Sequence, residues 1–221
     1  MKNLIIAAHP DDEILGCGGL IAKQKKCGID SYVVILTDGA KGRYSPRQAA
    51  ALRKNALEAN KKVGTKKVFF EDFPNQKLDA IALSGIIGCI EKYISRLDAD
   101  SLYTHHAADL NKDHRIAYEA SITAARPIPG QKIKRLFTYN VASATEWNSM
   151  EKEDLFIPNI FLDIAGEIGV KTAAMSRYES EARPYPHPRS PEAIKAYANY
   201  WGISAGIKYA EPFRLIREVR K

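Results

Sequence analysis

Residues 1–21 constrain the fold of this chain more than any other segment. The apolar run at residues 4–8 is typical of a strand buried in a parallel sheet. Pro10 ends this run, and apolar residues then recur at helical spacing over residues 14–21. A strand–turn–helix unit of this kind places its turn at the carboxyl edge of an open α/β sheet, where ligands bind in that fold class. The turn holds one imidazole and three carboxylates: His9, Asp11, Asp12 and Glu13.

Strand and helix signals alternate through the rest of the first 140 residues. Runs of strand length stand at residues 31–37, 67–70, 101–104 and 136–139, and helical patterns at 46–63, 78–97 and 116–125. The alternation predicts an α/β fold with a doubly wound, mostly parallel, Rossmann-like sheet and helices on both faces. Because parallel strands share one carboxyl edge, the polar segments that follow these strands should meet there.

The pattern changes after about residue 140. We expect a strand at 159–163, helices at 164–181 and 192–201, and a last apolar segment that ends near Val219. The proline-rich run at 183–191 cannot be regular structure, because proline removes backbone donors and restricts its neighbours. The expected organisation is a single domain over residues 1–221, with a Rossmann-like core at 1–140 and a C-terminal elaboration at 141–221.

The composition is that of an ordinary globular protein. No segment has the roughly 18 uninterrupted apolar residues of a membrane span, and the first apolar run is too short for a signal peptide, so we expect a cytoplasmic location. The formal net charge of +7 is spread in short clusters, without a nucleic-acid-binding motif. We therefore expect no nucleic-acid partner. Solvated faces, or a mild attraction of an anionic substrate such as a phosphate-bearing sugar, account for the charge.

A second polar cluster follows the strand expected at 101–104, and it contains His105, His106, Asp109, Asp113 and His114. With the first cluster it offers the ligands of a catalytic zinc site, which uses three protein ligands and keeps one position open for water. Zinc lowers the pKa of that water to about 7, and a nearby carboxylate can take its second proton. The competing interpretations are a capped turn at His9 and Asp12, and a pair at His105 and His106 that bonds to backbone.

Several motifs resemble those of one protein family. Residues 8–13 read AHPDDE, as in the PIG-L/LmbE-like zinc-dependent deacetylases, which remove acetyl groups from N-acetylglucosamine-type sugars. Residues 36–39 (LTDG) and 109–114 (DLNKDH) support the match, and residues 171–180 and 187–190 are similar to the bacterial branch that acts on small sugar conjugates. The resemblance covers essentially the whole chain. It implies a hydrolase that releases acetate and a free amino sugar from a small acetylated amino-sugar conjugate.

The resemblance also implies roles for individual residues. His9, Asp12 and His114 would bind one Zn²⁺ per chain, although iron or cobalt could take its place. Asp11 would be the general base that activates a water at the metal and then protonates the leaving amine. The chain departs from the family at Asn111, where many members have a histidine that is thought to help stabilise the oxyanion. The Asn111 amide could still donate to the oxyanion.

Other residues are expected to contact the substrate. The full expected set is Asp38, Arg53, His106, Asn111, His187 and Arg189. His105 or His106 could supply the electrophile in place of Asn111. Arg53 would bind sugar hydroxyls or phosphate, with a surface salt bridge as the alternative. A proline-stiffened loop holds His187 and Arg189, and we expect it to close over the substrate. The oligomeric state stays open, since relatives include hexamers and smaller assemblies.

Two other functions compete with this interpretation. A metal-dependent hydrolase of another amide or of a phosphoester would keep the metal, but such chemistry often uses two metals about 3.5–4 Å apart. Two histidines and one aspartate suit a single zinc better. A non-catalytic sugar- or nucleotide-binding module belongs to a different class. The first turn lacks the GxGxxG phosphate motif, and a binding module would have little use for Asp11 beside Asp12.

Overall fold

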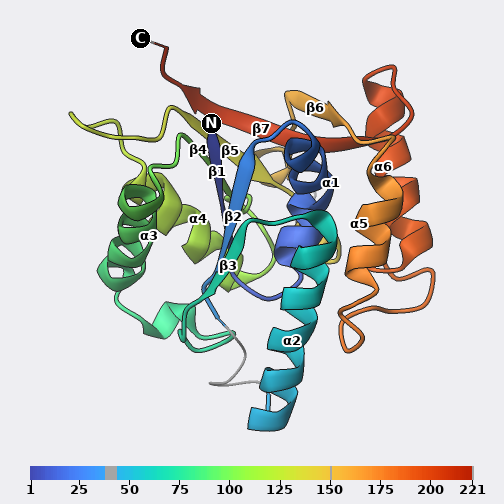
Figure 1. Ribbon diagram of the computed structural model, residues 1–221, viewed down its shortest axis with the longest axis horizontal. Helices are drawn as coiled ribbons and strands as arrows, with labels where there is room; N and C mark the ends of the chain where they lie inside the picture. The colour runs from blue at the N-terminus through green and yellow to red at the C-terminus, as the bar shows by residue number, and fades with distance from the viewer. Residues whose placement is uncertain (38–43, 150, 221) are drawn as a thin grey trace.

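The computed structural model describes residues 1–37, 44–149 and 151–220. Seven strands form one sheet in the order β3-β2-β1-β4-β5-β7-β6 (Figure 1). They are β1 (Lys2–Ala7), β2 (Asp30–Ile35), β3 (Lys67–Phe70), β4 (Ser101–Thr104), β5 (Arg135–Tyr139), β6 (Ile160–Asp163) and β7 (Ala210–Glu218). Neighbours from β3 to β5 are parallel, whereas β7 pairs antiparallel with both β5 and β6. The predicted doubly wound, mostly parallel α/β fold is confirmed.

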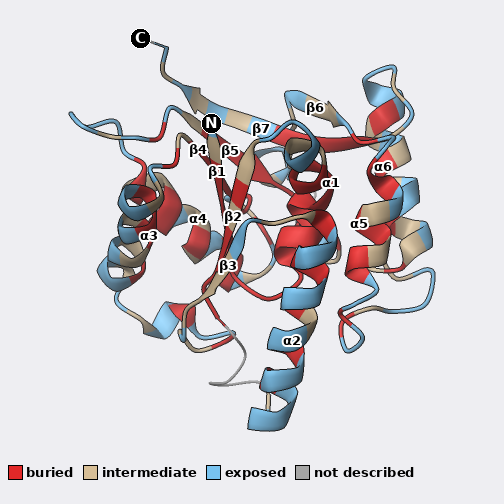
Figure 2. Ribbon diagram, viewed as in Figure 1, coloured by how far each residue is buried: buried red, intermediate tan, exposed pale blue. Residues whose placement is uncertain are grey.

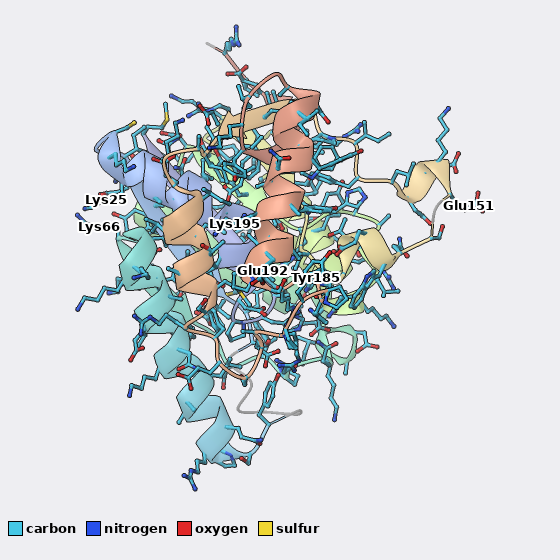
Figure 3. All side chains as sticks on the ribbon, turned by 90° about the vertical axis from the view of Figure 1, so that its right-hand side faces the viewer. Lys25, Lys66, Glu151, Tyr185, Glu192 and Lys195 are labelled. Atoms are coloured by element: carbon cyan, nitrogen blue, oxygen red, sulfur yellow. The ribbon has the colours of Figure 1, made fainter. Side chains whose placement is uncertain are left out.

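Helices cover both faces of this sheet. On one face lie α3 (Leu83–Leu97) and α4 (Lys112–Ala124), and on the other lie α1 (Asp12–Lys26), α2 (Pro46–Val63), α5 (Ile168–Met175) and α6 (Pro191–Ser204). Each face has its own apolar cluster, to which β1 contributes Ile5 on the α1 side and Leu4 and Ile6 on the α3 side. Figure 2 shows the burial concentrated on the sheet and on the helix surfaces that face it. In Figure 3, where α6 faces the viewer, Glu192 and Lys195 mark its outer side.

The elements set by local pattern have their expected bounds, including the helix at 46–63 and the strands at 67–70 and 101–104. Helix α4 begins at Lys112 rather than at 116, because the Asn111 side chain caps it by accepting the Asp113 N–H (2.9 Å). This cap places Asp113 and His114 in the first helical turn. The helix expected at 78–97 is split, since Asp113 accepts the Leu78 N–H (3.0 Å) and holds a separate 3-10 turn before α3.

Helix α5 covers residues 168–175, although the sequence pattern predicts 164–181. The chain turns after Met175 so that the fully buried Tyr178 can reach the carboxylate of Glu13. Across the described ranges, no helix combines the length and the apolar character that crossing a membrane requires.

Because Gly16 has no side chain, helix α1 can lie close to the sheet. A Cβ atom there would lie 2.2 Å from a ring carbon of Tyr139. The Tyr139 hydroxyl donates to the carbonyl of Ile6 (2.7 Å) and lies 3.3 Å from His105 Nε2. The close approach of helix and ring therefore fixes the carboxyl end of β1, from which the polar turn projects.

Replacing Gly16 by alanine should lower the free energy of unfolding by about 1–3 kcal/mol, because the buried Tyr139 ring would have to move. Gly88→Ala in α3 is the matched control, since nothing lies within 4 Å of the added Cβ. That variant should gain up to about 1 kcal/mol, the usual cost of glycine in a helix. Urea unfolding measures both values. A Gly16→Ala protein as stable as Gly88→Ala would contradict the packing described for α1.

Candidate metal centre

The two polar clusters meet at the carboxyl ends of β1 and β4. These strands are adjacent and parallel, in register from Asn3 opposite Ser101 to Ile5 opposite Tyr103. The other neighbour of β1 is β2, so the strand order reverses between β1 and β4. Such a reversal leaves a crevice between loops that run to opposite faces of the sheet. The turn after β1 and the first turn of α4 both open into this crevice.

Three potential metal-ligand atoms lie close together in these turns, one from each of the buried side chains of His9, Asp12 and His114. His9 Nδ1 lies 3.2 Å from His114 Nε2 and 3.4 Å from Asp12 Oδ2. The distance from His114 Nε2 to Asp12 Oδ2 is 3.3 Å. A tetrahedral ion with bonds of about 2.0–2.1 Å separates its ligand atoms by about 3.3 Å. The three atoms therefore fit one face of a tetrahedral metal site.

A carboxylate lies beside the other ring nitrogen of each histidine. Asp113 Oδ2 is 3.0 Å from His9 Nε2, and Asp109 Oδ1 is 3.1 Å from His114 Nδ1. Carboxylates in this position fix the tautomer and the orientation of metal-binding histidines. Asp113 is itself held by two backbone N–H groups, at 2.8 and 3.0 Å. The pattern leaves His9 Nδ1 and His114 Nε2 as the free ligand atoms.

The charges on these side chains depend on one another. Burial opposes a charge on His114, but Asp12 and Asp109 raise its pKa to about 10. Burial also opposes ionisation of Asp12, yet His114 and His9 hold its pKa well below the usual range. Without a metal, the site therefore pairs a carboxylate with an imidazolium at neutral pH. A metal ion has to displace that proton to bind.

Asp11 stands beside this triangle in a strained backbone conformation, with φ at 109°. Its N–H donates to Glu13 Oε2 (3.1 Å). The fully buried Glu13 accepts at Oε1 from Asn60 Nδ2 (2.7 Å) and from the hydroxyl of Tyr178. Contacts from α2 and from the segment after α5 thus hold the turn that presents Asp11.

The Asp11 carboxylate is buried and has a cation beside it. One guanidinium nitrogen of Arg189 lies 2.8 Å from Asp11 Oδ2 and 3.1 Å from a carboxylate oxygen of Glu181. Arg189 Nε donates to Ser143 Oγ (2.8 Å). Burial raises the pKa of Asp11 to about 8, and the attraction of Arg189 opposes this rise. A carboxyl group with a raised pKa can exchange a proton near neutral pH, as a general base requires.

His9 and His114 of the triangle line, together with Asp11, a cavity of about 370 Å³, the size of a small-ligand site. Two of the expected substrate-binding residues, Asn111 and Arg189, line it. His187 does not line the cavity, but its imidazole contacts the lining residue Trp147 edge to face, with centroids 5.6 Å apart. Asp38 lies outside the described residues.

The remaining two expected contacts do not line this cavity. His106 Nε2 lies 3.1 Å from the carbonyl oxygen of Asp154. Arg53 is exposed on α2, and its guanidinium lies 4.3 Å from the centre of the Phe70 ring. Although His106 follows a strand end and Arg53 lies in a nearby helix, they contact Asp154 and Phe70. Their positions in the sequence did not reveal these contacts.

His105 is fully buried behind the metal ligands. Its Nε2 accepts the backbone N–H of Ala8 (2.9 Å), and its ring stacks on that of His114 with centroids 4.0 Å apart. Burial is the main cause that lowers the pKa of His105 to about 3, and the positive charge on His114 lowers it further. This imidazole is therefore neutral. His105 therefore supports the end of β1 rather than facing the cavity.

Sequence reasoning missed several cavity-lining residues: Gln76, Ser143, Trp147 and Glu181. Gln76 and Ser143 have positive φ values of 58° and 71°, and no local sequence pattern predicts this backbone conformation. Trp147 could have been found by extending the strand-end rule, because it lies in the segment that follows β5 at the same edge of the sheet. Glu181 reaches the site through tertiary packing alone.

Comparisons with known proteins bear on this site. A family model described as "PIG-L: GlcNAc-PI de-N-acetylase" matches residues 4–125. The uncharacterized deacetylase YaiS of Escherichia coli (strain K12) is 31% identical over 183 residues, which are 80% of this chain and 90% of that protein. The diacetylchitobiose deacetylase of Thermococcus kodakarensis is 27% identical over 231 residues, covering 97% of this chain and 83% of that protein. The crystal structure of the conserved protein TT1542 from Thermus thermophilus superposes with a TM-score of 0.78 at 27% identity, covering 99% of this chain and 96% of that one.

The apparent affinity of the metal-free protein for Zn²⁺ should rise with pH between about 7 and 9. The pKa of His114 is about 10 without metal, so each bound ion displaces a proton in this range. One displaced proton raises the affinity up to about tenfold per pH unit. Competition with a chromogenic chelator at several pH values measures the slope.

The raised pKa of His114 also determines how the folding stability of the metal-free protein changes with pH. A histidine whose folded pKa exceeds the ordinary 6.5 stabilises the fold below that pH, and this contribution is lost as pH rises toward about 10.

His106→Gln is the control for the zinc-affinity measurement. The His106 ring lies away from the metal centre, so this variant should keep the wild-type slope of affinity against pH. An affinity that stays flat from pH 7 to 9 would contradict the displacement of a proton from His114.

Proposed function

Because this chain belongs to the PIG-L family, we propose that it is a zinc-dependent N-deacetylase of small N-acetylglucosamine-type sugar conjugates. It is a deacetylase by its family and its relatives, and the zinc and the sugar are the proposed parts. The reaction is hydrolysis of a linear amide, which releases acetate and a free amino sugar. The observation that carries the proposal is the triangle of His9 Nδ1, Asp12 Oδ2 and His114 Nε2 with the Asp11 carboxylate beside it.

His9, Asp12 and His114 would hold the metal, and their neighbours Asp109 and Asp113 would orient the two imidazoles. When bound, Zn²⁺ lowers the pKa of a water molecule and polarises a carbonyl oxygen. Among the described residues, one group of histidine and carboxylate side chains has this geometry. That supports one ion per chain, in contrast to the two-metal sites of many phosphoester hydrolases.

Asp11 is the group proposed to move the proton. As a water molecule adds to the carbonyl carbon of the amide, Asp11 accepts the proton that the water loses. It then gives this proton to the amide nitrogen while the C–N bond breaks, so that the products are acetate and the amine. Arg189 attracts the carboxylate from 2.8 Å, which favours the charged form that can accept a proton.

Asn111 is the proposed donor to the oxyanion. Its Oδ1 accepts the N–H of Asp113 (2.9 Å), so its amide NH₂ group points away from the helix, and Nδ2 lies 3.5 Å from Gln76 Oε1. Both amides line the cavity. His105 is less suited, because it is neutral and its Nε2 accepts a backbone N–H, and His106 lies elsewhere. A side-chain amide is a competent oxyanion donor.

The substrate class rests on the relatives and on the cavity. One relative is named for its action on diacetylchitobiose, a dimer of N-acetylglucosamine. The cavity of about 370 Å³ has the volume expected for a small ligand. We assign substrate contacts to Asn111 and Arg189 and a supporting position to His187, and we assign none to Arg53 or His106. Asp38 remains a prediction from sequence.

Asp11→Asn should lower kcat for acetate release by about 10²–10⁴-fold, because the amide cannot accept the proton of the attacking water. The metal content should be unchanged, since the ligand atoms belong to other residues. Acetate release from N-acetylglucosamine conjugates, with elemental analysis of each preparation, measures both quantities.

Asp98→Asn provides the matched control, because that carboxylate is 65% exposed and pairs with Lys132 on the surface. It should retain wild-type turnover. Wild-type turnover by Asp11→Asn would show that another residue is the base. Loss of the metal together with turnover would instead make Asp11 a ligand.

A further inference from the structure

The cavity has an apolar rim above its polar floor. Of the large apolar side chains that are exposed, Leu110 (50%) and Trp147 (52%) line it. An indole left half in water carries a free-energy cost that a bound apolar surface would relieve. Trp147 lies in the loop that follows β5, within the 3-10 turn Thr145–Trp147.

This loop is hydrogen-bonded to the metal centre. The Thr145 hydroxyl donates to Asp109 Oδ2 (2.6 Å) and accepts the Val141 N–H (2.8 Å). The other oxygen of Asp109 lies 3.1 Å from His114 Nδ1. Trp147 is therefore two residues from a side chain that shares a buried carboxylate with a proposed metal ligand. Its position relative to the reacting amide is set by these bonds.

The loop is also joined to the proposed base. Ser143 Oγ accepts from Arg189 Nε (2.8 Å), and Arg189 pairs with Asp11. The backbone N–H of Arg189 donates to His187 Nδ1 (3.2 Å), and the His187 ring packs edge to face on Trp147. The indole is thus braced on one side by a residue of the same network, as a binding platform has to be.

The charges at the cavity favour a neutral group over Trp147. The described residues that line the cavity include one arginine, Arg189, and one lysine, Lys112, and both are already paired with carboxylates. Arg189 contacts Asp11 and Glu181, and Lys112 donates to Asp79 Oδ2 (2.9 Å). A phosphate at this rim would have to compete with these carboxylates, whereas a neutral sugar ring would not.

We infer that Trp147 is a stacking platform for a second, neutral sugar ring, attached to the sugar whose acetyl group is removed. The C–H face of a pyranose is apolar and slightly positive, so it packs on the negative face of an aromatic ring, while its hydroxyl edge stays in water. This inference rests on the proposed function and adds the substrate specificity of the same site. Trp147 makes the enzyme prefer a disaccharide to a monosaccharide.

The test compares N,N'-diacetylchitobiose with N-acetylglucosamine as substrates for Trp147→Ala and Trp147→Phe. In Trp147→Ala, the ratio of kcat/KM for the disaccharide to that for the monosaccharide should fall about 10- to 100-fold, mainly through KM, because a stacked ring is lost. Trp147→Phe should restore much of the preference. The matched control is Trp201→Phe, the other tryptophan, which does not line the cavity and should keep the wild-type ratio.

A ratio unchanged in Trp147→Ala overturns the inference while leaving the deacetylase proposal intact. An equal fall of kcat on both sugars overturns it too, since that result indicates a structural role. If the wild-type protein releases acetate from neither sugar, the proposed function fails instead.

A binding measurement decides the platform in every case. In the Trp201→Phe background, Trp147 is the sole tryptophan. Adding diacetylchitobiose to metal-free protein should change its fluorescence at lower concentration than N-acetylglucosamine does. Identical responses to both sugars, or no response, overturn the inference.

Discussion

The parallel pairing of β1 with β4 is the contact on which the rest of the site depends. Its register sets Ile5 opposite Tyr103, so the two strands deliver their polar segments to the same edge of the sheet. His9 and His114, which are 105 residues apart in the chain, then face each other at 3.2 Å. Because the strand order reverses at this pair, the two segments open into a crevice rather than being covered by a crossover helix.

This convergence buries three consecutive carboxyl groups, and each one has a different partner. Asp12 faces His9 and His114, with His105 behind them. Glu13 accepts bonds from Asn60 and Tyr178, and Asp11 faces Arg189. Buried carboxylates are tolerated when they are paired in this way. The partners also separate the pKa values: that of Asp12 is held well below its usual range, and burial raises that of Asp11 to about 8. One turn can therefore supply both a metal ligand and a proton acceptor.

Local sequence patterns predicted the strands of the core and the edge at which the polar clusters meet, because periodicity and strand-end position determine both. The start of α4 was missed, since it depends on the side chain of Asn111 capping the helix. The surroundings of Asp11 were also out of reach, since Arg189 was expected to contact the substrate and not the proposed base. Glu181 comes to the cavity from the C-terminal third through tertiary contacts that leave no spacing in the sequence, whereas Trp147 follows β5 and was within reach of the strand-end rule. His106 shows the converse, a plausible residue that packs on Asp154 instead.

The central claim is that His9, Asp12 and His114 form a preorganised site for one metal ion beside Asp11. Anomalous diffraction at the zinc edge, from crystals of the zinc-loaded protein, tests it most directly. We predict one strong peak per chain, about 2.0–2.2 Å from His9 Nδ1, Asp12 Oδ2 and His114 Nε2. A peak elsewhere, or a second peak of equal height about 3.5–4 Å from the first, would contradict the claim.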